Sequence, residues 1–173
     1  MDLPQSDAFV FFGATGDLAY KQIFPSLQRL AKRGKLNGPV IGVAKAGWSL
    51  AQLKARAKDS VEQHGGADPE GLPKLLERLR YVDGDYADDS TFAQVRQALG
   101  DAKHPLHYLA IPPGLFAEVI EKLKTSGNAD GARVVVEKPF GRDLETARAL
   151  NAVIHRVFAE RDIFRIDHYL GKN

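Results

Sequence analysis

The sequence predicts an α/β fold built around a doubly wound parallel sheet. Short apolar runs recur along the chain, and segments with helical spacing of apolar residues separate them. The runs cover residues 8–12, 39–44, 80–85, 106–111 and 133–136. The first run is apolar throughout, as expected of a parallel strand that is covered by helices on both faces. We expect residues 1–173 to form one domain, since this length suits a single α/β unit.

Helical spacing places a helix after each of these runs. The first begins at Asp17 and contains Pro25, which lacks an N–H donor and should kink it. The second has Ser49 as its N-cap. Two more are expected over residues 88–99 and 115–123. The expected buried faces are Ile23, Leu27, Leu30 and Ala31; Leu50, Leu53, Ala57 and Val61; Leu72, Leu75, Leu76 and Leu79; and Leu144, Ala147, Leu150, Ile154 and Val157.

Composition excludes several classes of function. The chain contains no cysteine, so disulfides, thiolate metal sites and cysteine nucleophiles are ruled out, and we expect no metal. The formal charge of +2 gives little reason to expect a nucleic-acid partner. No apolar run approaches the roughly 20 residues that cross a bilayer, and residues 1–7 do not resemble a secretory signal. We therefore expect a cytoplasmic protein with no membrane partner.

The turn after the first strand has the pattern of a dinucleotide-binding site. Residues 13–19 read GATGDLA, a G-x-x-G-x-x-A variant that joins the first strand to the first helix. Gly13 permits a tight turn, Gly16 allows close approach of a pyrophosphate, and Ala19 allows close packing of helix and strand. The predicted cofactor-binding residues here are Gly13, Ala14, Thr15, Gly16, Asp17 and Leu18. The pattern indicates a Rossmann-type dinucleotide-binding domain, and a glycine-containing turn without a ligand is the alternative.

The residue at the end of the second strand bears on which dinucleotide is bound. Enzymes that use NAD often place a carboxylate there, which accepts a hydrogen bond from the ribose 2′-hydroxyl. Here the strand runs into Lys45, whose ammonium group would attract a 2′-phosphate. This favours NADP, although a solvated lysine at a strand end would look the same in the sequence.

Three stretches together resemble the glucose-6-phosphate dehydrogenase family. They are FGATGDLAYKQIFPSL (residues 12–27), EKPFGRDLETA (residues 137–147) and RIDHYLGK (residues 165–172), and the segment YLAIPP (residues 108–113) is also similar. The resemblance implies oxidation of D-glucose 6-phosphate at C1 with transfer of a hydride to NADP, the entry step of the pentose phosphate pathway. It also implies a longer polypeptide, because members of the family are more than twice this length.

The resemblance further implies roles for particular residues. Lys45 stands where the family usually has an arginine that contacts the 2′-phosphate, so use of NAD is possible as well. The residues that match the adenosine side are Asp85 and Tyr86. Lys138 matches a lysine that contacts both the sugar and the nicotinamide, whereas His168, Tyr169 and Lys172 match residues that bind the sugar phosphate.

Catalysis itself is expected to depend on residues outside this chain. The family's general base is a histidine in a second, catalytic and dimerising domain, which we expect beyond Asn173. Asn173 stands where the family usually has glutamate. The full-length form is expected to be a homo-oligomer, and this chain to supply the cofactor site and part of the sugar-phosphate site.

Two other functions remain open from the residues alone. One is a stand-alone NAD(P)-binding module without catalytic activity. The other is a related NAD(P) oxidoreductase, but short-chain members rely on a Tyr-x-x-x-Lys pair, and the candidate Tyr20 is followed at that spacing by Phe24.

Overall fold

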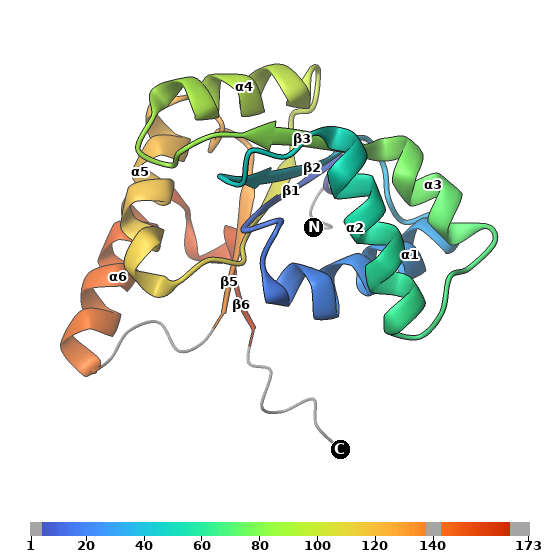
Figure 1. The fold of residues 1–173 in the computed structure, drawn as a ribbon. Coiled ribbons are helices and arrows are strands. Elements are labelled where there is room, and N and C mark those ends of the chain that lie inside the picture. The colour runs from blue at the N-terminus through green and yellow to red at the C-terminus, as the bar shows by residue number, and fades with distance from the viewer. Residues whose placement is uncertain (1–4, 138–142, 167–173) are drawn as a thin grey trace.

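A six-stranded parallel sheet forms the centre of the chain (Figure 1). The computed structural model describes residues 5–137 and 143–166. The strands are β1 (Ala8–Phe12), β2 (Val40–Ala44), β3 (Leu79–Asp83), β4 (Pro105–Leu109), β5 (Arg133–Glu137) and β6 (Ile163–Ile166). Every pairing is parallel, and the order is β3-β2-β1-β4-β5-β6. The order reverses between β1 and β4, which confirms the expected doubly wound α/β class.

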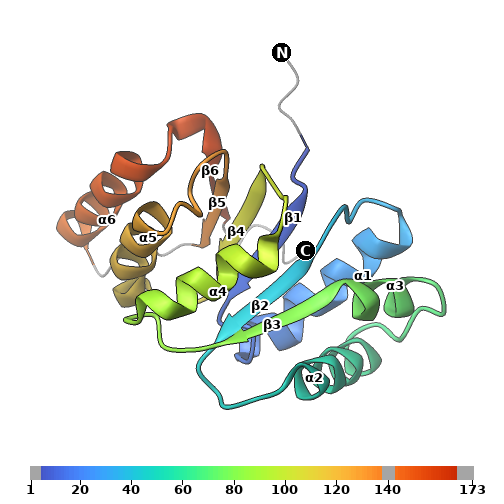
Figure 2. The same cartoon turned by 90° about the horizontal axis from the view of Figure 1, so that it is seen from above.

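Helices cover both faces of this sheet. They are α1 (Phe24–Lys32), α2 (Leu50–Gln63), α3 (Gly71–Arg78), α4 (Asp89–Leu99), α5 (Phe116–Thr125) and α6 (Leu144–Val157). Figure 2 shows α1, α2 and α3 on one side of the sheet and α4, α5 and α6 on the other. Single-turn 3-10 helices lie at Pro113–Leu115 and Glu160–Asp162.

The first strand shows why the sequence forms this layered core. Side chains alternate across a strand, so Val10 and Phe12 point into the core under α4, α5 and α6, whereas Phe11 points into the core under α1, α2 and α3. All three side chains are fully buried. An apolar residue at every position is therefore what a strand with two covered faces requires, as predicted.

The helix starts follow local capping chemistry. The Ser49 hydroxyl accepts from the Gln52 amide at 3.2 Å, and the Gln52 side chain accepts from the Ser49 amide at 2.7 Å. This capping box confirms the predicted start of α2. Asp143 and Thr146 form a second capping box at the start of α6.

The expected kink at Pro25 takes another form. A five-residue π-helix, Ala19–Ile23, follows the glycine turn and runs into α1. The Phe24 amide donates to the carbonyl of Ala19, five residues back. Pro25 occupies the first turn of α1, where a missing N–H is tolerated. The prediction put Pro25 in the interior of a helix; the structure puts it in the first turn of α1, because the helix changes type just before it.

Several expected core positions lie at the surface. Leu30 is 38% exposed, Leu50 is 37% exposed and Leu144 is 66% exposed. Both Leu50 and Leu144 are the first residues of their helices, where the chain has not yet reached the sheet. In α6, only Ile154 is buried among the described residues of the helix. Helical spacing identified the buried faces of these helices but overestimated how many residues of each face are buried.

Several strand assignments also change, among them β4, which spans Pro105–Leu109 instead of residues 106–111. Leu79 begins β3 rather than closing the preceding helix, and β3 ends at Asp83 instead of Asp85. The edge strand β6 was not predicted at all, since its four residues, IFRI, include an arginine and follow a 3-10 turn. Its register is set by β5, with Val134 opposite Ile163. Among the described residues, no helix is both long and apolar enough to cross a membrane.

One titratable side chain lies inside the core. His107 in β4 is fully buried, and its Nε2 lies 2.8 Å from the Asn128 carbonyl, which can only accept a hydrogen bond. The Nδ1 atom has no hydrogen-bond partner among the described residues. Burial lowers the pKa of His107 to about 4, and the bond to Asn128 opposes that shift. The folded chain therefore favours the neutral form of the His107 ring.

This burial predicts an acid-sensitive stability. The folded-state pKa of His107 lies below its unfolded value, so its contribution is fully present above about pH 6.5 and falls as the pH drops toward 4. Between pH 7 and pH 5 we expect the free energy of unfolding to fall by roughly 2 kcal/mol from this group. His107→Gln, which keeps a donor for the Asn128 carbonyl, should flatten that fall in urea titrations. An equal fall in both proteins would contradict the assignment.

Candidate functional site

The glycine turn lies at the carboxyl edge of the sheet, where the strand order reverses. Gly13 follows β1 directly and has φ +83°, a conformation that favours glycine. A Cβ at Gly13 would lie 2.0 Å from the Ala110 carbonyl oxygen, so a side chain is excluded there. A ligand at the crevice of a doubly wound sheet binds at this edge. The structure therefore places the predicted turn at the edge where ligands of doubly wound sheets bind.

The opening beside Gly16 suits a close approach from outside. A Cβ built on Gly16 would have only the Gly13 carbonyl oxygen within 4 Å, at 3.3 Å, among the described residues. The chain becomes helical at Asp17, and the first amides of a helix have no acceptor within it. Such amides, together with the helix dipole, bind phosphate groups. Gly16 and Asp17 are exposed at this opening and Thr15 is half-buried, whereas Ala14 and Ala19 are buried.

The backbone of the turn is held from two sides. The Gly13 amide lies 3.0 Å from the Val43 carbonyl and 2.9 Å from the Tyr86 hydroxyl, which accepts from it. The same hydroxyl donates to the Val43 carbonyl at 3.2 Å. Burial raises the pKa of Tyr86 to about 12, so the hydroxyl keeps its proton. Tyr86, expected on the adenosine side, thus also links the turn to β2.

The π-helix behind the turn has its own anchor. The hydroxyl of Ser60, a fully buried residue of α2, donates to the Tyr20 carbonyl. The guanidinium of Arg56 lies 4.1 Å above the Tyr20 ring, and the Tyr20 hydroxyl donates to Asp59. Isolated π-helical turns are common at functional sites. Sequence reasoning missed these residues, since no local motif connects α2 with residues 19–23.

Lys45 and Asp85 are brought together at the ends of β2 and β3. The Lys45 ammonium lies 2.8 Å from Oδ2 of Asp85. Hydrogen bonding to Lys45 holds the pKa of Asp85 below its usual value, and the same contact raises the pKa of Lys45. Both groups are therefore charged at neutral pH. The sequence identified each residue but not their contact.

A second carboxylate fixes the loop after Lys45. Oδ1 of Asp83 accepts from the amides of Ala46 and Gly47, both at 2.9 Å, and from the Tyr81 hydroxyl at 2.6 Å. These bonds tie the end of β3 to the loop between β2 and α2. The Tyr81 hydroxyl bond is the largest influence that lowers the pKa of Asp83. Asp83 was not predicted, although its place at a strand end could have suggested a loop anchor.

The strands that precede the expected substrate residues in the sequence end at the same edge of the sheet as β1. Lys138, His168, Tyr169 and Lys172 lie outside the described residues. The residues before them do not: Glu137 ends β5, Ile166 ends β6, and the two are paired in register. The Tyr108 hydroxyl in β4 also donates to the Glu137 carboxylate. The two described strands that precede these segments in the sequence thus end at one edge of the sheet.

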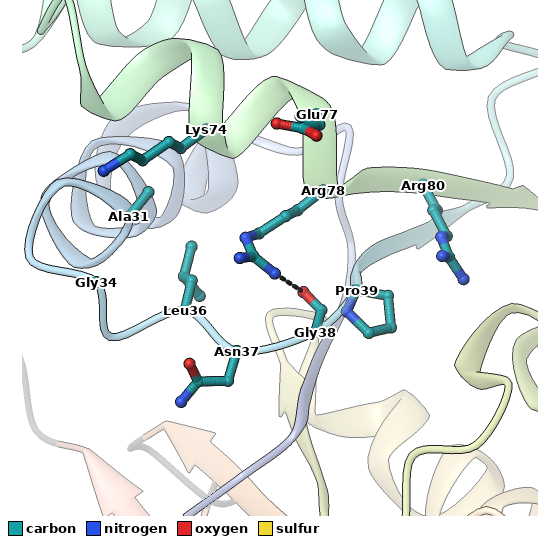
Figure 3. A pocket seen from close by; sticks show the side chains of 10 residues that line it. All are labelled: Ala31, Gly34, Leu36, Asn37, Gly38, Pro39, Lys74, Glu77, Arg78 and Arg80. Carbon is teal, nitrogen blue, oxygen red and sulfur yellow. Dashed lines mark hydrogen bonds between the residues drawn. The ribbon is translucent and has the colours of Figure 1, made fainter.

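A broad hollow in the described structure lies elsewhere. A depression of about 560 Å³ opens at the amino ends of β2 and β3, the edge opposite the glycine turn. Figure 3 shows that the charged ends of Lys74, Arg78 and Arg80 do not converge within it. Arg78 donates to the Gly38 carbonyl and Arg80 to the Ala98 carbonyl. These guanidinium groups hold the backbone together, and we do not assign a ligand to this hollow.

Comparison with known proteins identifies the family. The family model described as "Glucose-6-phosphate dehydrogenase, NAD binding domain" matches residues 10–173. The chain belongs to the glucose-6-phosphate dehydrogenase family. This membership, and the similarity to an NAD-binding domain, support a nicotinamide dinucleotide as the cofactor. The match to this family model also favours the glucose-6-phosphate dehydrogenases over the short-chain reductases as relatives of this chain.

Named relatives of the glucose-6-phosphate dehydrogenase family cover nearly all of this chain. Glucose-6-phosphate 1-dehydrogenase 1 of Mycobacterium tuberculosis is 42% identical over 167 residues, which are 96% of this chain and 36% of that protein. The enzyme of Saccharomyces cerevisiae is 37% identical over 175 residues, 93% of this chain and 35% of that protein. The chain thus spans about a third of the length of these relatives.

Solved structures of the family share the fold. The glucose-6-phosphate 1-dehydrogenase of Mycobacterium avium matches 96% of this chain and 37% of its own, with a TM-score of 0.89 and 44% identity. A glucose-6-phosphate dehydrogenase solved in complex with glucose 6-phosphate matches 98% of this chain and 38% of its own, with a TM-score of 0.86 and 34% identity.

The open space beside Gly16 generates a prediction. Gly16→Val should greatly weaken dinucleotide binding, because its methyl groups would stand where the pyrophosphate approaches the backbone. The fold should tolerate the change, since only the Gly13 carbonyl lies near and φ at Gly16 is not positive. Calorimetric titration with NADP and NAD measures the effect.

A matched control for Gly16→Val adds a similar side chain far from the turn. Ala93 is exposed on α4, so Ala93→Val should bind both dinucleotides like the parent. Thermal unfolding of all three proteins separates lost binding from lost folding. Equal affinity in parent and Gly16→Val would show that the turn is not the phosphate site.

Proposed function

We propose that this chain is the cofactor-binding part of an enzyme that oxidises D-glucose 6-phosphate at C1 to 6-phosphogluconolactone, with NADP as the hydride acceptor. The observation that carries the proposal is the glycine turn, which opens a helix at the point of strand-order reversal in a chain of this family. Relatives named glucose-6-phosphate 1-dehydrogenase support the reaction, and it is proposed for the whole polypeptide.

The residues present fit a phosphorylated dinucleotide. When bound, NADP supplies the acceptor for the hydride. Gly13, Gly16 and the helix start would hold its pyrophosphate, and Lys45 would meet the 2′-phosphate. Tyr86 and Asp83 orient these groups through the backbone.

The sugar phosphate is proposed to bind at the same edge, beyond β5 and β6. His168, Tyr169 and Lys172 offer an imidazole, a phenol hydroxyl and an ammonium group, which suit a phosphate dianion. Lys138 would reach the sugar near the nicotinamide. The register of Glu137 with Ile166 supports this arrangement, because both segments start from neighbouring strand ends.

A general base for the C1 hydroxyl is proposed to lie outside this chain. Three of the four described histidines lie at the amino edge of the sheet or inside it. His64 bonds the Ser60 carbonyl at the end of α2, His104 precedes β4, and His155 pairs with Glu160 near the end of α6. His107 is enclosed in the core. The His64 ring lies behind the glycine turn, edge-on to the Tyr20 ring with the ring centroids 5.1 Å apart, and its Nδ1 is engaged by the Ser60 carbonyl.

The charge on Lys45 yields a prediction about cofactor choice. Lys45→Ala should weaken NADP binding more than NAD binding, by on the order of 1–3 kcal/mol for a lost charged hydrogen bond. Titration with each cofactor measures the difference, and Lys58→Ala, which removes an exposed lysine from α2, is the control. An equal loss for both cofactors, or none, would leave Lys45 as a solvated lysine.

The missing base predicts that the 173-residue chain is inactive by itself. Loss of a general base typically costs about 10²–10⁴-fold in rate, and loss of substrate positioning adds to this. Reduced cofactor is followed by absorbance with glucose 6-phosphate and either NADP or NAD. The full-length Mycobacterium tuberculosis relative provides the assay control. Turnover near one per second, within the usual range of enzymes, would overturn the prediction.

A further inference from the structure

The lysine expected to recognise the 2′-phosphate is already paired with a carboxylate. Lys45 and Asp85 lie 2.8 Å apart at the ends of β2 and β3, and their side chains are 70% and 41% exposed. We propose that Asp85 limits the preference for NADP over NAD, by opposing the 2′-phosphate of NADP and accepting a hydrogen bond from the 2′-hydroxyl of NAD. The inference rests on the proposed dinucleotide site and adds a determinant to it.

Asp85 is held in place independently of Lys45. Its Oδ1 accepts from the Ala87 amide at 2.9 Å, which leaves Oδ2 for Lys45. Its carbonyl oxygen accepts from the Thr91 hydroxyl at 2.7 Å and from the Asp88 amide at 3.1 Å. The carboxylate therefore stays at the strand end when Lys45 moves to a ligand, and its negative charge stays with it.

The neighbouring carboxylate, Asp83, has a different role. Oδ1 of Asp83 already accepts three hydrogen bonds, from Ala46, Gly47 and Tyr81. Those bonds form the loop that carries Lys45, so Asp83 acts on the backbone. Among the described residues, Oδ2 of Asp85 has one partner, the exposed side chain of Lys45.

The two cofactors meet this pair differently. A ribose 2′-hydroxyl donates one hydrogen bond, and a carboxylate near the end of the second strand is the usual acceptor in enzymes that bind NAD. A 2′-phosphate brings negative charge beside Asp85 and must compete with it for Lys45. Repulsion of one ligand and attraction of the other both act on selectivity. Asp85 should thus reduce the preference for NADP over NAD that Lys45 alone would produce.

The test removes the charge of Asp85 and keeps its shape. Asp85→Asn retains an acceptor for the Ala87 amide, and Asp88→Asn removes a neighbouring charge from the same loop that acts on Lys45 only through space. Dissociation constants for NADP and NAD are measured with the purified chain. Quenching of Trp48, the only tryptophan, provides the signal from the loop after Lys45. Asp85→Ser, which keeps a hydroxyl acceptor for Ala87, is a second variant should the first unfold.

The expected result is a change in selectivity. In Asp85→Asn the ratio of the NAD constant to the NADP constant should rise on the order of tenfold, because repulsion is removed and the acceptor is weakened. Asp88→Asn should change the ratio less than Asp85→Asn does, because the Asp88 charge reaches Lys45 only through space. An unchanged ratio in Asp85→Asn, or the same rise in both variants, would overturn the inference while dinucleotide binding stands. Failure of the parent to bind either cofactor would overturn the proposed site and the inference with it.

Discussion

The hydrogen bonds at the Gly13 amide connect the parts of this site. That amide meets the Val43 carbonyl and the Tyr86 hydroxyl, so the turn after β1 is joined to β2 and to the loop after β3. The positive φ of Gly13 directs the chain away from β4, where the Ala110 carbonyl leaves no room for a side chain. From this junction the backbone passes Gly16 and becomes helical. The helix start, the open space and the strand-order reversal therefore coincide at one point of the sheet edge.

The two carboxylates at this edge, Asp83 and Asp85, have different roles. Oδ1 of Asp83 accepts hydrogen bonds from two backbone amides and from the Tyr81 hydroxyl, and these bonds shape the loop that carries Lys45. Asp85 faces the ammonium group and remains partly exposed. An exposed ion pair of this kind contributes little to stability, because water screens both partners. Its position at the ends of adjacent strands matters more for what can bind there than for how firmly the chain folds.

Much of the site could be predicted because its signals are local. The glycine pattern, its place after an apolar strand and the lysine at the next strand end are all contained in short stretches, and the structure puts each at the carboxyl edge. The contact between Lys45 and Asp85 joins residues 40 positions apart, as does the bond from Ser60 to Tyr20. Such contacts depend on strand order and helix placement, which no local pattern encodes.

The sequence by itself determined the class of fold, the turn and the family, since periodicity, glycine spacing and short motifs are properties of neighbouring residues. It misjudged Leu30, Leu50 and Leu144, because burial depends on how far the covering layers extend. It also missed β6, a strand made by pairing with β5 more than by its own composition. Only the tertiary structure decided that Tyr86 holds the turn and that Asp85 faces Lys45, because both interactions arise from packing between strands that are distant in the chain.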